Sequence, residues 1–139
     1  MSKVAVVFWS GTGNTEMMAN AVVDGAKNAG AEVTLFGCEF SADNVAEYDA
    51  IAFGCPAMGA EVLEEGEFEP MFMSIEGSLS GKKIALFGSY GWGDGQWMRD
   101  WEERVAQAGA QLVTDSVMAN NAPDDAALEE CKALGAALA

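Results

Sequence analysis

The chain has 139 residues, of which 22 are acidic and 7 are basic, and its net charge at pH 7 is −15. A charge of this sign argues against nucleic acid and anionic membrane surfaces as partners, and it favours a basic protein partner. The chain also contains no histidine. Because histidine is the commonest metal ligand and the usual general base near neutral pH, hydrolytic triads and zinc sites are not expected.

The length and even composition predict one domain spanning residues 1–139. The cysteines Cys38, Cys55 and Cys131 are odd in number and lack Cys-x-x-Cys spacing, so we expect reduced, mostly buried thiols rather than a disulfide framework or an iron–sulfur site. The first apolar run begins at Val4, which leaves no room for a signal peptide, and no apolar run reaches the ~20 residues of a membrane span. We therefore expect a cytoplasmic protein, and we expect it to be a monomer.

Apolar runs predict five strands, at residues 4–9, 33–36, 50–55, 84–87 and 111–117. The first four runs are continuous, which is typical of parallel strands buried on both faces.

Segments of helical period separate these strands. The first places Met18, Val22 and Ala29 on one face and ends at Gly30, a natural C-cap. Further helices are predicted at residues 66–77, 96–108 and 124–138, with a short helical or irregular crossover at 43–47.

Strands that alternate with helices predict an α/β fold, a doubly wound parallel sheet with helices on both faces. Such a sheet binds ligands at the carboxyl ends of its strands. That rule selects three loops, at residues 10–15, 56–66 and 88–96.

The first loop is suited to holding an anion. It consists of Ser10, Gly11, Thr12, Gly13, Asn14 and Thr15. Backbone N–H groups, side-chain donors and the positive end of the next helix can converge there on one phosphate. The loop lacks the lysine of a nucleotide-hydrolysing P-loop, and Glu16 stands where a dinucleotide-binding motif has its third glycine. The alternative is a glycine-rich turn in which Asn14 or Thr15 caps the helix.

The second loop can cover a flat ring and change its backbone conformation. It begins with Pro56, Ala57, Met58, Gly59, Ala60 and Glu61. Met58 is a soft side chain able to cover an aromatic face, and Gly59 allows a positive φ. The alternative is a turn glycine beside a core methionine, followed by an acidic stretch that is simply a solvated face.

The third loop has the composition of a stacking platform. Residues 88–95 contain four glycines, two of which are Gly91 and Gly93, together with Ser89, Tyr90, Trp92 and Asp94. Glycines beside Tyr90 and Trp92 let the backbone approach a flat ligand closely, although the two aromatics could instead pack structurally. A phosphate loop and an aromatic slot on one sheet edge indicate a phosphorylated planar cofactor, which flavin mononucleotide (FMN) matches.

Three motifs, at residues 9–16, 54–59 and 86–93, resemble the short-chain flavodoxins, especially those of anaerobic bacteria. The resemblance covers essentially the whole chain. It implies a flavodoxin-like five-stranded parallel sheet of order 2-1-3-4-5 and a non-covalent FMN. It also implies low-potential one-electron transfer between semiquinone and hydroquinone, in place of ferredoxin and without enzymatic activity of its own.

The resemblance also implies roles for individual residues. The 10–15 loop next to Trp9 would hold the phosphate, while Met58 and Trp92 would cover the two flavin faces. The carbonyl of Gly59 would be the redox-sensitive one, and Glu61 would meet the flavin N3 edge. The backbone around Gly91 would face N1 and O2.

Two positions depart from close relatives of that family. Pro56 stands where some carry a serine, and Ala60 stands where others carry an aspartate or another polar residue. These departures leave the exact potential open.

The three loops contain no lysine or arginine, and an acidic stretch with Glu64, Glu65 and Glu67 follows residues 56–61. Like charges there would resist the second electron and make that couple strongly reducing. The implied partners are redox proteins with basic docking patches, namely ferredoxin-dependent oxidoreductases and hydrogenase-type or NAD(P)H reductase-type enzymes.

Two other functions remain open from the residues. An FMN-dependent NAD(P)H or quinone reductase could use the same fold, although the chain has no second nucleotide motif and little length to shape a substrate pocket. A signalling receiver domain would need an acidic metal pocket at the strand ends. Here those ends are Trp9-Ser10 and Gly54-Cys55, so no such acidic pocket is expected.

Overall fold

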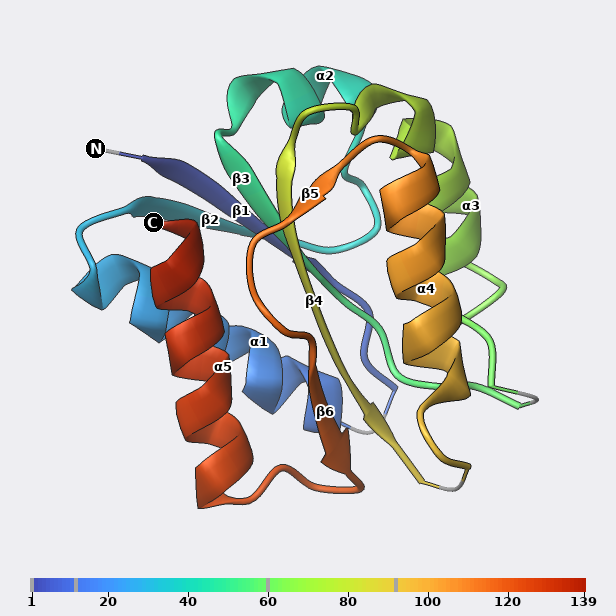
Figure 1. The fold of residues 1–139 in the computed structure, drawn as a ribbon. Coiled ribbons are helices and arrows are strands. Elements are labelled where there is room, and N and C mark those ends of the chain that lie inside the picture. The colour runs from blue at the N-terminus through green and yellow to red at the C-terminus, as the bar shows by residue number, and fades with distance from the viewer. Residues whose placement is uncertain (1, 12, 60, 92) are drawn as a thin grey trace.

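A parallel sheet forms the centre of the molecule, shown in Figure 1 by a computed structural model that describes residues 2–11, 13–59, 61–91 and 93–139. The strand order is β2-β1-β3-β4-β5, with β6 also paired to β4. Every pairing between these strands is parallel. The predicted order 2-1-3-4-5 is thereby confirmed. The strands are β1 (Lys3–Phe8), β2 (Glu32–Phe36), β3 (Ala50–Gly54), β4 (Lys83–Tyr90), β5 (Gln111–Leu112) and β6 (Val117–Asn120).

Helices cover both faces of this sheet (Figure 1). Successive β1 residues point to opposite faces, so Val4 and Val6 pack with α1 and α5, whereas Ala5 and Val7 pack with α2, α3 and α4. Each face therefore has its own apolar core. The helices are α1 (Asn14–Asn28), α2 (Ala42–Glu47), α3 (Phe68–Ile75), α4 (Gln96–Gln107) and α5 (Asp125–Leu138), and a 3₁₀ turn, η1 (Glu76–Ser78), follows α3.

The first helix follows its predicted pattern except at its last turn. Met18 and Val22 are fully buried, and Gly30 adopts the left-handed φ of 96° expected of a residue that ends a helix. Ala29, predicted on the same buried face, is exposed because α1 ends at Asn28.

Two strand predictions were wrong in detail. Strand β2 is not buried on both faces, since it lies at the sheet edge and Leu35 is 43 % exposed. The last strand is not continuous over 111–117. The polar residues Thr114, Asp115 and Ser116 interrupt it, and the Ser116 hydroxyl donates to Glu102 (2.7 Å). Pairing with β4 resumes in β6 and continues three residues beyond the predicted end.

Helices α1 and α5 cross in main-chain contact. A Cβ added to Gly25 would lie 2.0 Å from the carbonyl oxygen of Lys132, and one added to Gly135 would lie 2.1 Å from that of Val22. No side chain larger than hydrogen fits at either glycine without separating the helices.

All three cysteines are free thiols. Cys55 and Cys131 are buried and Cys38 is partly exposed. Burial, reinforced by nearby glutamates, raises the pKa of Cys38 to about 11, and burial raises the pKa of Cys131 to about 12. Burial also raises the pKa of Cys55 far above its usual range.

The longest helices are α1 and α5. Across residues 2–11, 13–59, 61–91 and 93–139, no helix combines the length and the apolar character needed to cross a bilayer.

Candidate functional site

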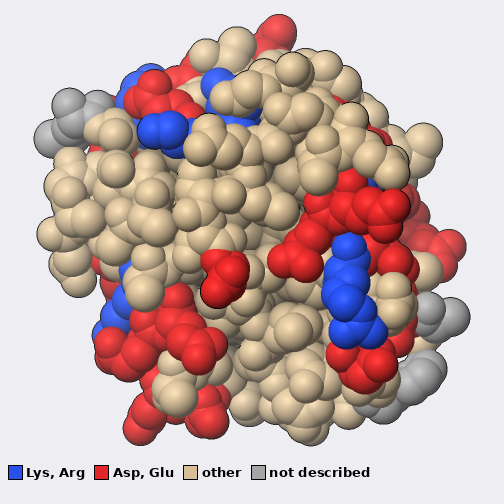
Figure 2. Space-filling model, viewed as in Figure 1, with Lys and Arg blue, Asp and Glu red and all other residues tan. Residues whose placement is uncertain are grey.

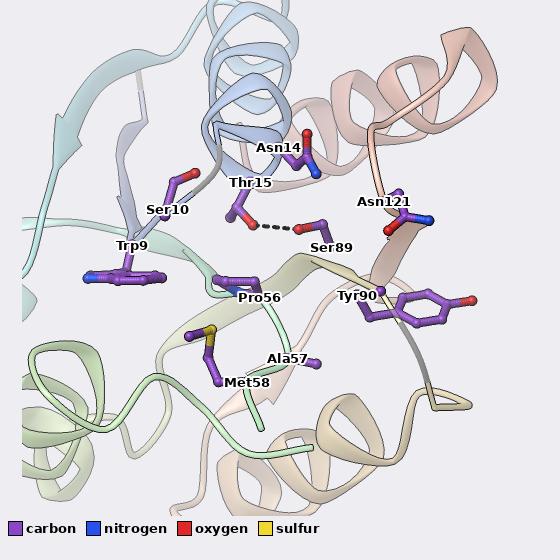
Figure 3. A pocket seen from close by; sticks show the side chains of 12 residues that line it. Trp9, Ser10, Asn14, Thr15, Pro56, Ala57, Met58, Ser89, Tyr90 and Asn121 are labelled. Atoms are coloured by element: carbon purple, nitrogen blue, oxygen red, sulfur yellow. Dashed lines mark hydrogen bonds between the residues drawn. The ribbon is translucent and has the colours of Figure 1, made fainter. Parts of the chain in front are cut away.

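A pocket of about 220 Å³ opens where the predicted ligand loops meet, at the carboxyl ends of β1, β3 and β4. Figure 3 shows residues from segments far apart in the sequence pointing into it. Its lining consists of Trp9, Ser10, Gly11, Asn14, Thr15, Pro56, Ala57, Met58, Ser89, Tyr90, Gly91 and Asn121. All but Asn121 belong to the residues predicted from the sequence.

One side of the pocket is polar. The buried hydroxyls of Thr15 and Ser89 lie 3.1 Å apart and share a hydrogen bond, and Ser10 and Asn14 lie beside them (Figure 3). Ser10 shapes the loop, because its Oγ accepts hydrogen bonds from the backbone N–H groups of Gly13 (3.1 Å) and Glu16 (3.3 Å). Gly13, in a left-handed conformation, is the N-cap of α1, rather than Asn14 or Thr15. The positive, N-terminal end of α1 thus lies beside the neutral hydroxyl and amide groups on this side of the pocket.

The other side of the pocket is apolar and is formed by the second loop, with Trp9 and Tyr90 at opposite ends (Figure 3). Met58 is 36 % exposed there and is not a core residue. Its backbone exchanges two hydrogen bonds with Val62, at 2.8 and 3.0 Å, which close the loop into a tight turn. Inside this turn Gly59 has a φ of 48°, a left-handed conformation that glycine adopts without a steric penalty.

Glu61 also has a left-handed φ, of 57°, and its side chain connects two of the loops. Its Oε1 accepts hydrogen bonds from the backbone N–H groups of Gly95 and Gln96, both at 3.2 Å, at the N-terminus of α4. The favourable interaction of a carboxylate with a helix N-terminus holds the second loop against the third.

The third loop is supported from below by Trp97. The ring of Tyr90 lies 5.6 Å from that of Trp97, whose Nε1–H donates to the carbonyl of Cys55 (3.1 Å). At Gly88 a Cβ would lie 2.2 Å from the same carbonyl, so β3 and β4 approach more closely there than any side chain would permit.

A cation missed by the sequence analysis lies against this loop. The guanidinium of Arg99 donates to the Asp94 carbonyl (3.1 Å), the Asp94 carboxylate (3.0 Å) and the Gln96 side chain (2.9 Å). The three loops themselves contain no cation, but α4 brings one next to them.

Asn121 is the lining residue that the sequence analysis missed. It has a left-handed φ of 59°, and its backbone N–H donates to the carbonyl of Tyr90 (2.7 Å). Asparagine tolerates this conformation better than most residues. The signal was present, because a strand that ends at Asn120 places the following residue at the ligand edge of the sheet.

Four other predicted residues are not among those that line the pocket, namely Gly13, Gly59, Glu61 and Gly93. Three others, Thr12, Ala60 and Trp92, lie outside the described residues. The two flavin faces predicted for Met58 and Trp92 therefore stay predictions.

The acidic stretch that contains Glu64, Glu65 and Glu67 is more than a solvated face. The Glu64 carboxylate accepts hydrogen bonds from the backbone N–H groups of Gly66 (2.8 Å), Glu67 (2.7 Å) and Phe68 (2.8 Å) at the start of α3. Partial burial acts to raise the pKa of Glu64, but the three donors outweigh it and the pKa is lowered. Glu67 extends toward the pocket and accepts a long hydrogen bond from Trp9 Nε1 (3.5 Å).

Negative charge predominates on the surface. On the face seen in Figure 2, carboxylates gather around the start of α5 and in the region of α4, where a run of basic atoms lies between them. This distribution agrees with the net charge of −15.

Comparisons with known proteins identify the family. The flavodoxin family profile matches residues 6–135. Over 137 residues the chain is 48 % identical to a flavodoxin of Megasphaera elsdenii, covering 98 % of each chain. Over 135 residues it is 47 % identical to a flavodoxin of Clostridium beijerinckii, covering 96 % of this chain and 97 % of the relative.

The fold is also similar to that of a solved structure. The solution structure of two-electron reduced Megasphaera elsdenii flavodoxin superposes with a TM-score of 0.90, covering 97 % of each chain at 48 % identity. Sequence motifs, sheet order and pocket position thus agree with one another, and the chain belongs to the flavodoxin family.

Proposed function

We infer that this chain carries single electrons on a non-covalently bound FMN, as an electron-transfer protein and not as an enzyme. The observation that carries this conclusion is the two-sided pocket. Neutral donors lie at the start of α1, and an apolar wall is formed by Trp9, Met58 and Tyr90.

The residues of the pocket fit FMN chemically. Hydroxyl and amide groups beside a helix N-terminus can hold a phosphate dianion without a lysine. Met58 and Tyr90 offer apolar surface to a planar ring, and Ser89 lies between the two regions. We propose that Ser10, Asn14 and the backbone of the 10–15 loop bind the phosphate.

FMN, when bound, supplies one-electron chemistry, and the chain sets its environment. We propose that Met58 excludes water from one face of the ring. We also propose that the carbonyl of Gly59 accepts a hydrogen bond at the proton-bearing edge of the flavin. The glycine makes this possible, since its peptide plane can turn over without a Cβ clash.

The surrounding charges favour a low potential. Glu67 accepts a hydrogen bond from Trp9 of the pocket lining, and Glu61 belongs to the second loop. Like charge at these positions opposes adding an electron nearby. Part of this charge is balanced, because Glu61 interacts with the N-terminus of α4 and Arg99 neutralises Asp94. We propose a low-potential carrier that exchanges electrons with basic partners.

We propose that the protein is a cytoplasmic monomer. Its proposed partners are ferredoxin-dependent oxidoreductases and hydrogenase-type or NAD(P)H reductase-type enzymes. The net charge of −15 supports basic docking surfaces on these partners.

Comparing FMN with riboflavin tests the function and the phosphate site together. The apoprotein should quench the fluorescence of FMN at a one-to-one ratio and bind riboflavin, which lacks the phosphate, far more weakly. Asn14→Ala should weaken FMN binding and leave riboflavin binding unchanged. Asn28→Ala, at the far end of α1, should alter neither.

Equal affinity for FMN and riboflavin would contradict the proposed phosphate site, and binding of neither flavin would contradict the function. Anaerobic mixing of the FMN-loaded protein with NADPH should leave the flavin oxidised. Rapid reduction by NADPH alone would favour the reductase alternative.

A further inference from the structure

A second cavity, of about 140 Å³, lies next to the proposed FMN pocket, between the end of the second loop and α4. Its apolar lining comes from Val62, Leu63, Trp97 and Trp101. Leu63 is 6 % exposed and each tryptophan is 2 % exposed, so these three form a floor, whereas Val62, 41 % exposed, lies at the surface.

The charge left over in this cavity is negative. Arg104 is the cation in its lining, but its guanidinium donates to both oxygens of Glu69 (2.7 and 2.6 Å) and to both of Glu76 (2.8 and 2.9 Å). Two further carboxylates, Glu61 and Asp100, remain uncompensated by any cation among the described residues.

Both of these carboxylates can accept further hydrogen bonds. One oxygen of Glu61 accepts from the N-terminus of α4, and one oxygen of Asp100 accepts from the Gln96 side chain (2.8 Å). Within the described part of the chain, the second oxygen of each has no hydrogen-bond donor.

The floor contains an unused donor. The Nε1–H of Trp101 is buried and has no acceptor among the described residues, although its ring packs edge-on against those of Phe68 and Phe72, at 5.6 and 5.9 Å. A buried N–H without an acceptor is costly and rare in folded proteins.

We propose that this cavity anchors a lysine or arginine side chain of a basic electron-transfer partner. The alkyl part of such a side chain would pack on Leu63 and the two indoles, and its charged nitrogen would donate to Glu61 and Asp100. This proposal rests on the proposed electron-carrier function.

The location of the cavity supports this role. It shares a wall with the proposed FMN pocket, because Tyr90 of that pocket packs against Trp97 of the cavity, and Met58 of that pocket is hydrogen-bonded to Val62. A partner anchored there would therefore lie beside the proposed FMN pocket.

Nuclear magnetic resonance of the FMN-loaded protein tests the proposal. The probe is Nα-acetyl-arginine methylamide, and the chain's four tryptophans provide separate indole N–H signals. We expect the Trp97 and Trp101 signals to shift saturably with the probe. Nα-acetyl-norleucine methylamide, a neutral probe of similar size, should produce much smaller shifts.

Two variants locate the binding site. Asp100→Asn should raise the dissociation constant of the arginine probe by about two- to fivefold, the range for one partly exposed ion pair. Val62→Lys should abolish the shifts by filling the cavity with its own cation. Asp24→Asn, an exposed position on α1 with the same charge change, should leave the dissociation constant unchanged.

Equal shifts with the arginine and norleucine probes would overturn the proposal. So would an equal loss of affinity in Asp100→Asn and Asp24→Asn. FMN affinity, measured in the same variants, should not change. A negative result for the anchor with FMN still bound would therefore leave the proposed function standing, whereas a protein that fails to bind FMN would refute that function instead.

Discussion

The indole N–H of Trp97 donates a 3.1 Å hydrogen bond to the main-chain carbonyl of Cys55, which ties α4 to the end of β3 beneath the proposed FMN pocket. Trp97→Phe removes this donor and leaves the carbonyl without it in the core. We expect the variant to lose about 1–3 kcal/mol of unfolding free energy beyond the cost of the smaller ring. Urea unfolding of the apoprotein measures this loss.

Trp101→Phe is the matched control for that variant. Trp101 is as deeply buried as Trp97, but its Nε1–H has no acceptor among the described residues. The substitution removes similar volume and no conventional hydrogen bond, so it should cost less than Trp97→Phe. Equal losses in the two variants would show that the bond to Cys55 adds nothing to stability.

The crossing of α1 and α5 predicts a second effect. Gly25→Ala and Gly135→Ala should each destabilise the protein by about 1–3 kcal/mol, because the added methyl group would overlap main-chain carbonyls and force the helices apart. This direction is opposite to helix propensity, which favours alanine by about 1 kcal/mol.

Gly77→Ala serves as the control for the glycine variants, since a Cβ there meets nothing within 4 Å. Its unfolding free energy should stay the same or rise slightly. Chemical denaturation measures the unfolding free energy of all three variants, and their midpoints can be compared directly where the m-value is unchanged. Stability retained in Gly25→Ala would mean that the helices separate at no cost.

Glu64 should contribute to stability in a pH-dependent way. Glu64→Gln removes the carboxylate that caps α3 and should cost about 1 kcal/mol at pH 7. Because the pKa of Glu64 is lowered on folding, its contribution is fully present above the unfolded pKa of 4.5. The contribution is then lost as the pH falls through the lower folded value.

Unfolding curves of the wild type and Glu64→Gln between pH 7 and pH 3 should therefore converge in acid. The exposed neighbour Glu65 offers a control of equal charge change. Glu65→Gln should not reproduce this convergence, and if it did, general charge rather than helix capping would explain the effect.

Gly59 should affect the flavin as well as the fold. Gly59→Val places a branched side chain at a φ of 48°, where it is strained, and hinders any reorientation of the peptide. On the proposed role of its carbonyl, stepwise anaerobic reduction of the FMN-loaded variant should yield less of the one-electron-reduced protein. Absorbance spectra recorded during the reduction measure this yield.

Gly81→Val separates strain from function. Gly81 also has a positive φ, of 76°, but it lies at the opposite end of the sheet, before β4. The variant should be destabilised while its one-electron-reduced form accumulates normally. A normal yield in Gly59→Val would contradict the proposed role of the carbonyl.

The sequence predicted those parts of the molecule that depend on local pattern. Continuous apolar runs indicated β1, β3 and β4, and clusters of glycine and hydroxyl residues at strand ends indicated most of the pocket. Residues such as Met58 and Ser89 could be found because the rule that ligands bind at the carboxyl edge needs only the ends of strands.

The remaining features depend on contacts between distant residues. The Glu61 carboxylate meets Gly95, 34 residues away, and no local pattern indicates where a side chain in a turn points. Asn121 was missed for a different reason, since the interruption at 114–116 concealed that the last strand resumes and reaches the ligand edge.

The buried thiols have a consequence for redox measurements. The chain has no imidazole, and the pKa of each cysteine is raised to about 11 or beyond. Neither of the two kinds of side chain that usually change charge between pH 6 and pH 9 does so here. A slope of midpoint potential against pH in that range would therefore contain no contribution from imidazole or thiol groups, whose charge stays constant.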